Sequence, residues 1–100
     1  MGQYFIIANL DKMEYIHPHD LKCGAKLLEI CNEKLIGGML LFLLKQSKNF
    51  KYLNIGRWAE DKIIVIGDYD NKDRFWHITN KFTNISRDII NEYRLFLREN

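Results

Sequence analysis

The chain has 100 residues, of which 47% are hydrophobic and 28% are charged, and its formal net charge is +2. This composition is that of one globular domain, which we expect over residues 1–100, and it excludes an intrinsically disordered chain. The small net charge gives no argument for a nucleic-acid partner, because proteins that bind nucleic acid usually carry a strong basic excess.

The N-terminal residues predict a β-hairpin. Residues 4–10 are aromatic and β-branched, as strands are, and the turn-forming sequence Asn-Leu-Asp-Lys follows at residues 9–12. Residues 14–17 are extended again. Pro18 ends this second strand, because a proline restricts the residue before it to extended geometry.

A helix is expected next, beginning at His19 or Asp20 and ending near residue 35. Its predicted buried stripe consists of Leu21, Ala25, Leu28, Cys31 and Leu35. On such a helix Cys23 and Cys31 lie about 12 Å apart at ~1.5 Å per residue, whereas a disulfide needs Cα atoms within roughly 7 Å. We therefore predict that these two cysteines are buried on one helix with Leu28 and Leu35, and that both thiols are free, as in a reducing compartment.

The pair Gly37-Gly38 interrupts the apolar pattern and predicts a corner between two helices. Residues 39–44 are apolar all round, which is typical of a short buried helix or a central strand. The helix is favoured, because Met and Leu dominate this run and no residue in it is β-branched.

A second hairpin is expected in the latter half of the chain. Residues 55–59 and 62–67 flank the pair Glu60-Asp61, and the second of these segments is the strongest strand signal in the chain. Residues 68–74 are polar and predict a loop. Residues 75–78 are a candidate fifth strand.

Asn84 or Ser86 is expected to cap a final helix that runs to about Leu97. Its predicted apolar face consists of Ile89, Tyr93, Phe96 and Leu97. The order of elements predicts an α+β fold, in which a small antiparallel sheet of two hairpins, with or without the fifth strand, packs against about three helices.

Five short blocks of the chain resemble a family of small phage and bacterial proteins that has no assigned biochemical function. They read MGQY at 1–4, NLDKxEYIxPH at 9–19, KLLE at 26–29, GRWAxDxI at 56–63 and GDYD at 67–70. The family's Gly-Asp-Gly before the first helix is replaced here by Lys22-Cys23-Gly24-Ala25, so any role of that aspartate is lost in this chain. The resemblance implies a separate fold and a mobile-element context, and it implies no reaction.

The histidines are the candidate catalytic or metal-binding residues. His17 and His19 are two residues apart, and alternation in an extended segment would place both on one side. A zinc site would need His77 or Asp68 as a third ligand, and no CxxC or HExxH motif completes it. We therefore expect no metal and no cofactor. A small hydrolase or nuclease that uses His17 and His19 with Lys12 is the third alternative for function.

Charge is distributed unevenly along the chain. Between Lys34 and Ala59 there are five basic residues and no acid, interleaved with aromatic residues. Cations beside aromatic stacking platforms are typical of proteins that bind single-stranded nucleic acid, and such a module is the second alternative for function. Its candidate residues are Lys45, Lys48, Phe50, Lys51, Tyr52 and Arg57.

Residues 60–73 contain five acids, which a protein would present to a basic partner. The favoured function is a non-catalytic binding protein of the inhibitor or immunity type, which neutralises a toxin nuclease or another enzyme by occlusion. Acidic residues would speed encounter with a basic partner, and aromatic residues would supply buried contact area. The candidate partner-binding residues are Asp68, Tyr69, Asp70, Asp73 and Trp76.

A cytoplasmic location without a membrane contact is expected. The N-terminus lacks the basic segment and the long apolar segment of a signal peptide. The longest apolar run, residues 39–44, is far shorter than the ~20 residues that span a bilayer.

Overall fold

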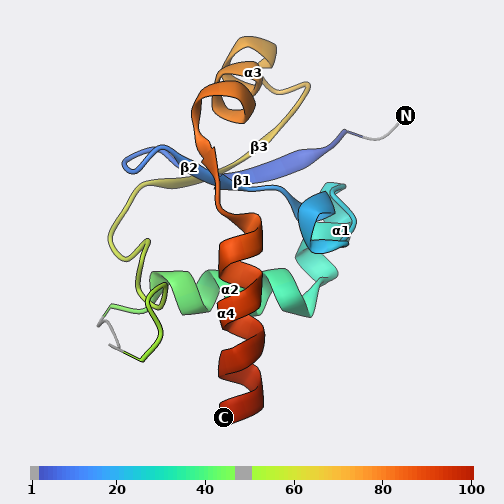
Figure 1. Cartoon of the computed structure of the whole chain (residues 1–100). Helices are drawn as coiled ribbons and strands as arrows, with labels where there is room; N and C mark the ends of the chain where they lie inside the picture. The colour runs from blue at the N-terminus through green and yellow to red at the C-terminus, as the bar shows by residue number, and fades with distance from the viewer. Residues whose placement is uncertain (1–2, 47–50) are drawn as a thin grey trace.

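The computed structural model describes residues 3–46 and 51–100 and has an α+β fold, as the sequence predicted (Figure 1). In chain order its elements are β1 (Phe5–Asn9), β2 (Glu14–Ile16), the 3-10 helix η1 (Pro18–Leu21), α1 (Leu27–Asn32), α2 (Lys34–Leu44), β3 (Ile63–Gly67), α3 (Lys72–Lys81), β4 (Thr83–Asn84) and α4 (Ser86–Glu99). Two of the candidate nucleic-acid-binding residues, Lys48 and Phe50, lie outside the described residues.

The sheet has four strands in the order β3-β1-β2-β4. β1 and β2 form the predicted first hairpin, with Ala8 opposite Tyr15. β1 also pairs antiparallel with β3, whereas the two-residue strand β4 pairs with β2 in parallel. The sheet is therefore mixed, and the predicted sheet of antiparallel hairpins is wrong in this respect.

The predicted second hairpin is also wrong, because residues 55–59 do not form a strand. They lie in successive turns, closed by hydrogen bonds such as that from the Ala59 amide to the Gly56 carbonyl at 3.1 Å. Gly56 and Glu60 have positive φ angles of 73° and 65°, which an extended strand does not contain. The second strand of the predicted pair is present as β3, and its partner is β1.

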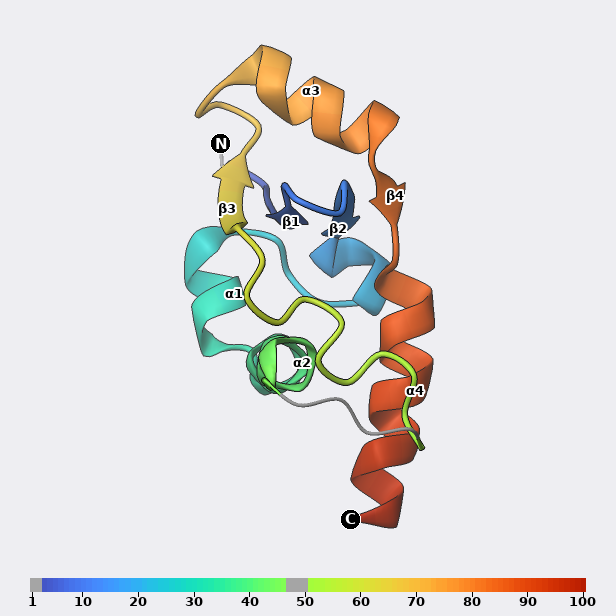
Figure 2. The same cartoon turned by 90° about the vertical axis from the view of Figure 1, so that its left-hand side faces the viewer.

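The sheet separates two layers of helices. Figure 2 shows α3 on one face and η1, α1, α2 and α4 on the other. Side chains alternate along β1, so that Ile6 and Ala8 pack with Ile78 of α3, whereas Ile7 packs in the larger core with residues of α2 and α4. β1 is therefore buried on both faces, and it is the central strand around which both layers assemble.

The helix predicted from His19 to residue 35 is broken into three pieces. η1 ends at Leu21, because its C-cap residue Lys22 has a left-handed φ of 60°, which ends a helix. α1 begins only at Leu27. Glu33 separates α1 from α2, because its side chain caps the new helix by accepting a hydrogen bond from the Leu35 amide at 3.1 Å.

This break places the predicted stripe on different elements. Leu28 and Cys31 are exposed, and Cys23 and Leu35 are half-buried, so the prediction that all four are buried on one helix is wrong. Both thiols are free, as predicted. Burial raises the pKa of the Cys23 thiol, with the Glu33 carboxylate adding to the effect.

The pair Gly37-Gly38 lies inside α2 and not at a corner between helices. The predicted short helix of residues 39–44 is therefore the second half of a longer one, in which Gly38 lies against Tyr93 of α4 and leaves no room for a side chain, whereas Gly37 faces open space. Of the helices that the structure describes, none is long and apolar enough to cross a membrane.

Residues 75–78 belong to α3 and are not a fifth strand. Asn71 caps this helix by accepting a hydrogen bond from the Arg74 amide at 3.0 Å, and Phe75, Ile78 and Phe82 then face the sheet. The final helix is present as α4. The predicted apolar face of α4 is confirmed except at Leu97, whose side chain is exposed.

Candidate functional site

The predicted acidic loop connects β3 to α3, and two of its carboxylates hold the N-terminal segment. Asp68 Oδ1 accepts a hydrogen bond from the Tyr4 amide at 3.1 Å. Asp70 accepts from the Gly67 amide at 2.8 Å and from Gln3 Nε2 at 3.0 Å. Both carboxylates therefore have a structural role in addition to any role toward a partner.

The predicted aromatic residues of this region are accessible. Tyr69 and Trp76 are both more than half exposed, and each has a lysine ammonium 6.0 Å from its ring centroid, Lys72 for Tyr69 and Lys81 for Trp76. The acids of this surface are thus interspersed with bases of α3, which include Arg74. The surface around Tyr69 and Trp76 therefore carries charges of both signs.

The predicted nucleic-acid-binding residues that the structure describes, namely Lys45, Lys51, Tyr52 and Arg57, do not form one open surface. Tyr52 is 4% exposed and Trp58, the next aromatic residue along the chain, is fully buried, so that no base can stack on either ring. Lys51 pairs with Glu99 at 3.3 Å. Arg57 pairs with Glu14, and Lys45 lies at the end of α2. Tyr52 contributes to the core and not to a binding platform.

His17 and His19 do lie side by side, with ring centroids 5.2 Å apart. The ring nitrogen Nδ1 of His17 is occupied, because it accepts a hydrogen bond from the His19 amide at 3.2 Å and thereby caps η1. His77 lies on α3, on the other side of the sheet (Figure 2). Among the residues that the structure describes, no three His, Cys, Asp or Glu side chains are grouped to hold a metal ion.

His17 makes the stability of the protein dependent on pH. Burial lowers the pKa of His17 below its ordinary value of 6.5, with Asp20 opposing and His19 adding to the effect. The unfolded chain then binds a proton near pH 6.5 that the folded chain binds only at lower pH. The free energy of unfolding should therefore fall as the pH is lowered from about 7.5 through 6.5 to the folded pKa.

His17→Asn keeps a capping acceptor and removes this titration. Chemical unfolding from about pH 7.5 to 5 should show a smaller decrease in the free energy of unfolding for this variant than for the original protein. Asp61 and Glu99, whose pKa values are lowered by hydrogen bonds from Lys12 and Tyr52, lose their contributions only at more acidic pH. Equal decreases in the two proteins would contradict the assignment to His17.

Two of the blocks that carry the family resemblance meet in one polar network. Glu14 of β2 accepts hydrogen bonds from Trp58 Nε1 at 2.9 Å and from Arg57 Nε at 3.1 Å, and it also pairs with the end of the guanidinium. Arg57 Nη1 donates to Asn54 at 2.6 Å, and Glu92 of α4 accepts from the Asn54 amide and side chain at 2.8 Å each. This network ties the turns before β3 to the hairpin and to α4, so its role is structural.

The exposed side of α2 is the feature that sequence reasoning missed. α2 has no polar side chain between Lys34 and Lys45, and a helix that is apolar all round is normally buried all round. Here only one side is buried. The other side is formed by Gly37, Leu41 and Leu44, and Leu41 is 75% exposed. A continuous exposed apolar surface, unlike a single exposed leucine, is typical of an interaction site.

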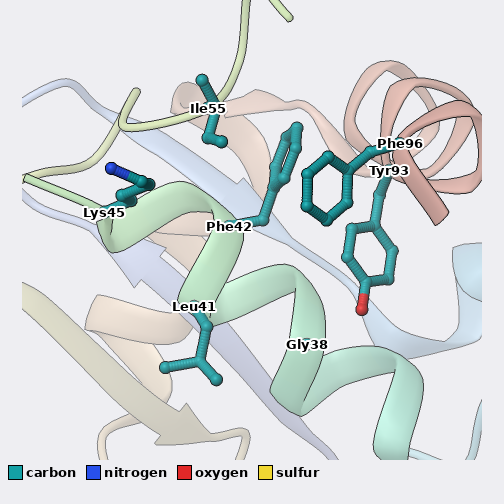
Figure 3. A pocket seen from close by; sticks show the side chains of 7 residues that line it. All are labelled: Gly38, Leu41, Phe42, Lys45, Ile55, Tyr93 and Phe96. Carbon is teal, nitrogen blue, oxygen red and sulfur yellow. The ribbon is translucent and has the colours of Figure 1, made fainter. Parts of the chain in front are cut away.

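This side of α2 borders a groove of about 290 Å³, which we call the α2–α4 groove (Figure 3). Its lining residues are Gly38, Leu41, Phe42, Lys45, Ile55, Tyr93 and Phe96. The Phe42 ring packs against those of Tyr93 and Phe96, with centroids 5.6 Å and 5.2 Å away, so that the floor of the groove is a set of mutually fixed aromatic rings. An apolar groove with one cation at its end suits an apolar ligand with a polar edge.

The sequence contained one signal of this site, namely an apolar run flanked by lysines and interrupted by two glycines. Comparisons with protein-family models, with curated proteins and with solved structures found no match to this chain. The resemblance to small phage and bacterial proteins stays a prediction. Inference about function therefore depends on the geometry of this chain.

Proposed function

We propose that this protein is a non-catalytic protein-binding domain that holds an apolar segment of its partner in the α2–α4 groove. The observation that carries the proposal is the exposed apolar side of α2 beside a floor of packed aromatic rings. The inhibitor or immunity role expected from the sequence is part of this proposal. A domain of this size that covers a working surface of its partner would block it by occlusion.

Burial of apolar surface provides the driving force for such binding. Each Å² of apolar surface removed from water contributes about 25 cal/mol, and a side chain such as Leu41 is already presented to solvent without a cost of rearrangement. The ring contacts of Phe42 with Tyr93 and Phe96 keep the groove in one shape. A preformed groove loses little conformational entropy on binding, which favours affinity.

The surface around Tyr69 and Trp76 is the alternative binding face for the same function. Its support is the exposure of two aromatic side chains, which are frequent hot spots of protein interfaces. It lies on the opposite layer from the α2–α4 groove (Figure 2). One experiment therefore distinguishes the two faces.

A photo-crosslinking amino acid placed at position 41, 76 or 28 in the producing cell tests the proposal. We expect a discrete protein adduct from position 41, because the partner segment lies against Leu41. Position 28 is the matched control, since Leu28 is 74% exposed, almost as much as Leu41, but lies on α1 outside the groove. No adduct, or a weaker one, is expected there.

An adduct from position 76 alone would overturn the groove as the binding site and support the Trp76 face. Equal adducts from positions 41 and 28 would mean unspecific contact and would also contradict the proposal. Leu41→Gln should abolish an adduct formed at a neighbouring groove position, whereas Leu28→Gln should not. Neither replacement removes a buried side chain, so both variants are expected to fold.

A further inference from the structure

The edge of the sheet at β3 lacks the features that usually protect an edge strand. β3 lies at one end of the strand order, and Figure 2 shows it at the border of the sheet, with α3 above it and α1 below it. Its five residues include no charge and no proline, and its pairing with β1 runs from Ile63 to Gly67 without a bulge. Charges, prolines and bulges are devices by which edge strands avoid pairing with another chain. The other edge strand, β4, has only two residues, so a further strand is best added at β3.

The hydrogen bonds at the two ends of β3 show which of its backbone groups point outward. Before the strand, the Leu10 amide donates to the Lys62 carbonyl at 2.9 Å. After the strand, the Asp68 amide donates to the Tyr4 carbonyl, also at 2.9 Å. Because hydrogen-bonded pairs alternate along an antiparallel ladder, the even-numbered residues of β3 bond to β1. The N–H and C=O groups of the odd-numbered residues therefore point away from β1, toward the free edge.

Two of the three odd-numbered residues are open at this edge, and the third is already bonded. The Gly67 amide donates to Asp70 Oδ2 at 2.8 Å, and the Gly67 carbonyl accepts from the Asp70 amide at 3.2 Å. Within residues 3–46 and 51–100, no hydrogen bond occupies the outward N–H and C=O groups of Ile63 and Val65. The Val65 side chain, in the middle of the strand, is 49% exposed. The open stretch thus presents two donors and two acceptors beside an exposed apolar side chain.

A second copy of this chain satisfies all four of these groups in one register. In a two-fold arrangement both copies contribute the same strand, and the two strands run antiparallel. With Ile64 at the axis, Ile63 of each copy lies opposite Val65 of the other, and the two pairs make four N–H···O bonds. The side chains of Ile63 and Val65 point to the same layer, so each exposed Val65 packs beside a β-branched residue. A register with Val65 opposite itself makes only two such bonds before it reaches Gly67, whose groups Asp70 already holds.

The charges at the two ends of β3 distinguish a second copy from an unrelated strand. Lys62 directly precedes the strand, and Asp68 directly follows it. In the antiparallel arrangement these residues lie diagonally across the contact, about 7–8 Å apart, within reach of a long side chain, and the two-fold axis forms the pair twice. In the described part of the chain, neither side chain forms an ion pair of its own. The strand is therefore complementary in charge to itself.

Other charges near the two ends weaken this attraction. Asp11 lies at the same end as Lys62, because its carboxylate accepts a hydrogen bond from the Lys62 amide at 2.7 Å. Asp61 is paired with Lys12, so these two charges neutralise each other. At the other end, residues 68–74 contain three acids and two bases, which leaves one negative charge for Lys62 to meet. The charge contribution is therefore local, and the backbone hydrogen bonds and apolar contacts supply the main attraction.

We infer that the protein forms a two-fold dimer in which the β3 strands of two copies pair antiparallel. One sheet of eight strands, four from each copy, then passes through the dimer. The axis is perpendicular to this sheet, so the α2 and α4 helices of both copies lie on the same side. The inference is independent of the proposed function, but it adds to it, because the dimer presents two α2–α4 grooves to one partner surface.

Sedimentation equilibrium of the full chain, from about 5 µM to 1 mM, measures the dimer. Pairing over so short a stretch buries little surface, so we expect a weak dimer with a dissociation constant of about 10–100 µM. Val65→Lys should keep the protein monomeric over this range, because a lysine in the middle of an edge strand blocks pairing. Leu41→Lys is the matched control, since it is the same replacement at an exposed apolar residue of α2, and it should dimerise as the original does. Neither residue is buried, so both variants are expected to fold.

An exchange of charges tests the direction of pairing. Lys62→Glu and Asp68→Lys should each weaken the dimer about threefold to tenfold at low salt, because each places like charges across the contact twice. The double variant Lys62→Glu/Asp68→Lys restores opposite signs and should recover most of the affinity. This recovery is the decisive result, because Asp68→Lys also removes the acceptor of the Tyr4 amide.

Amide hydrogen exchange followed by NMR tests the register. The amides of Ile63 and Val65 should exchange more slowly as the protein concentration is raised, because they donate hydrogen bonds across the dimer contact. The Gly67 amide, which donates to Asp70 within the same chain, should not respond to concentration. In Val65→Lys the Ile63 amide should lose its dependence on concentration.

Three results would overturn the dimer and leave the proposed function unaffected or relocated. A protein that stays monomeric up to about 1 mM has no such contact, and the α2–α4 groove remains a binding site for another protein. Self-association that Leu41→Lys abolishes and Val65→Lys does not would place the contact on α2, where a second copy would then occupy the groove. A double charge variant that associates no better than the single ones would exclude the antiparallel pairing of β3.

Discussion

Glu14→Ala should lower the free energy of unfolding by about 2–4 kcal/mol, a large share of the stability of a domain of this size. The Glu14 carboxylate is the shared acceptor of Arg57 and of the buried Trp58 indole. Its removal leaves a largely buried guanidinium and a fully buried N–H group without this partner. The side chain of Arg57 is 29% exposed, so some water reaches it, and we expect a loss below that of a fully buried ion pair.

Urea unfolding followed by tryptophan fluorescence measures this change. Trp58 is buried and Trp76 is exposed, so the change in emission on unfolding reports mainly on the environment of Trp58, beside the mutated residue. Glu60→Gln is the control, since this exposed carboxylate accepts only from Gln46 in the described residues, and it should change the free energy by at most about 0.5 kcal/mol. A loss below about 1 kcal/mol for Glu14→Ala would show that the network does not hold the fold.

The same network explains why residues 55–59 could not be predicted. Ile55 and Trp58 are buried as strand residues would be, and the local pattern alone favours a strand. The turn conformation is fixed by contacts with distant partners, namely Glu14 on β2 and Glu92 on α4. Such partners are invisible until the chain has folded, so tertiary contact overrides local propensity here.

The elements that were predicted correctly are those whose own residues are sufficient to indicate a strand or a helix. β1 and β3 are runs of β-branched and aromatic residues, and α4 repeats apolar residues at helical spacing from Ile89 to Phe96. Phe75 and Ile78 on α3 also have helical spacing, and Asn71 is a good N-cap, so the sequence did contain signals that predict this helix. A run of four residues was too short to decide between strand and helix from periodicity alone.

The candidate site could be predicted only in part. The exposure of Tyr69 agrees with its position in the polar segment of residues 68–74, whereas Trp76 belonged to the candidate strand of residues 75–78 and is exposed because this segment is helical. The α2–α4 groove could not be predicted from the sequence, because an apolar run does not indicate which side of the helix will be buried against the rest of the chain and which will stay exposed. Leu41 and Leu43 are alike in sequence, yet one is exposed and the other is fully buried.

Gly37→Ala and Gly38→Ala should have opposite effects on stability, although they are the same replacement at adjacent positions of α2. Alanine is favoured over glycine in a helix, so Gly37→Ala should raise the free energy of unfolding by about 0.5–1 kcal/mol. At Gly38 the added Cβ would lie 1.9 Å from Tyr93 Oη and 2.8 Å from Tyr93 Cζ, far inside contact distance. Tyr93 is nearly buried against Phe42 and cannot move away freely, so Gly38→Ala should lower the free energy by about 1–3 kcal/mol.

Urea unfolding of both variants, with Gly38→Ala/Tyr93→Phe as a third, measures the contact itself. Removal of the Tyr93 hydroxyl removes the 1.9 Å contact but leaves the 2.8 Å contact with Cζ. The double variant should therefore recover part of the lost free energy of unfolding and show coupling between positions 38 and 93. If Gly38→Ala stabilises the protein as much as Gly37→Ala, Tyr93 does not lie against α2. The α2–α4 groove would then have a different floor, and Leu41 would be an isolated exposed leucine with no site beside it.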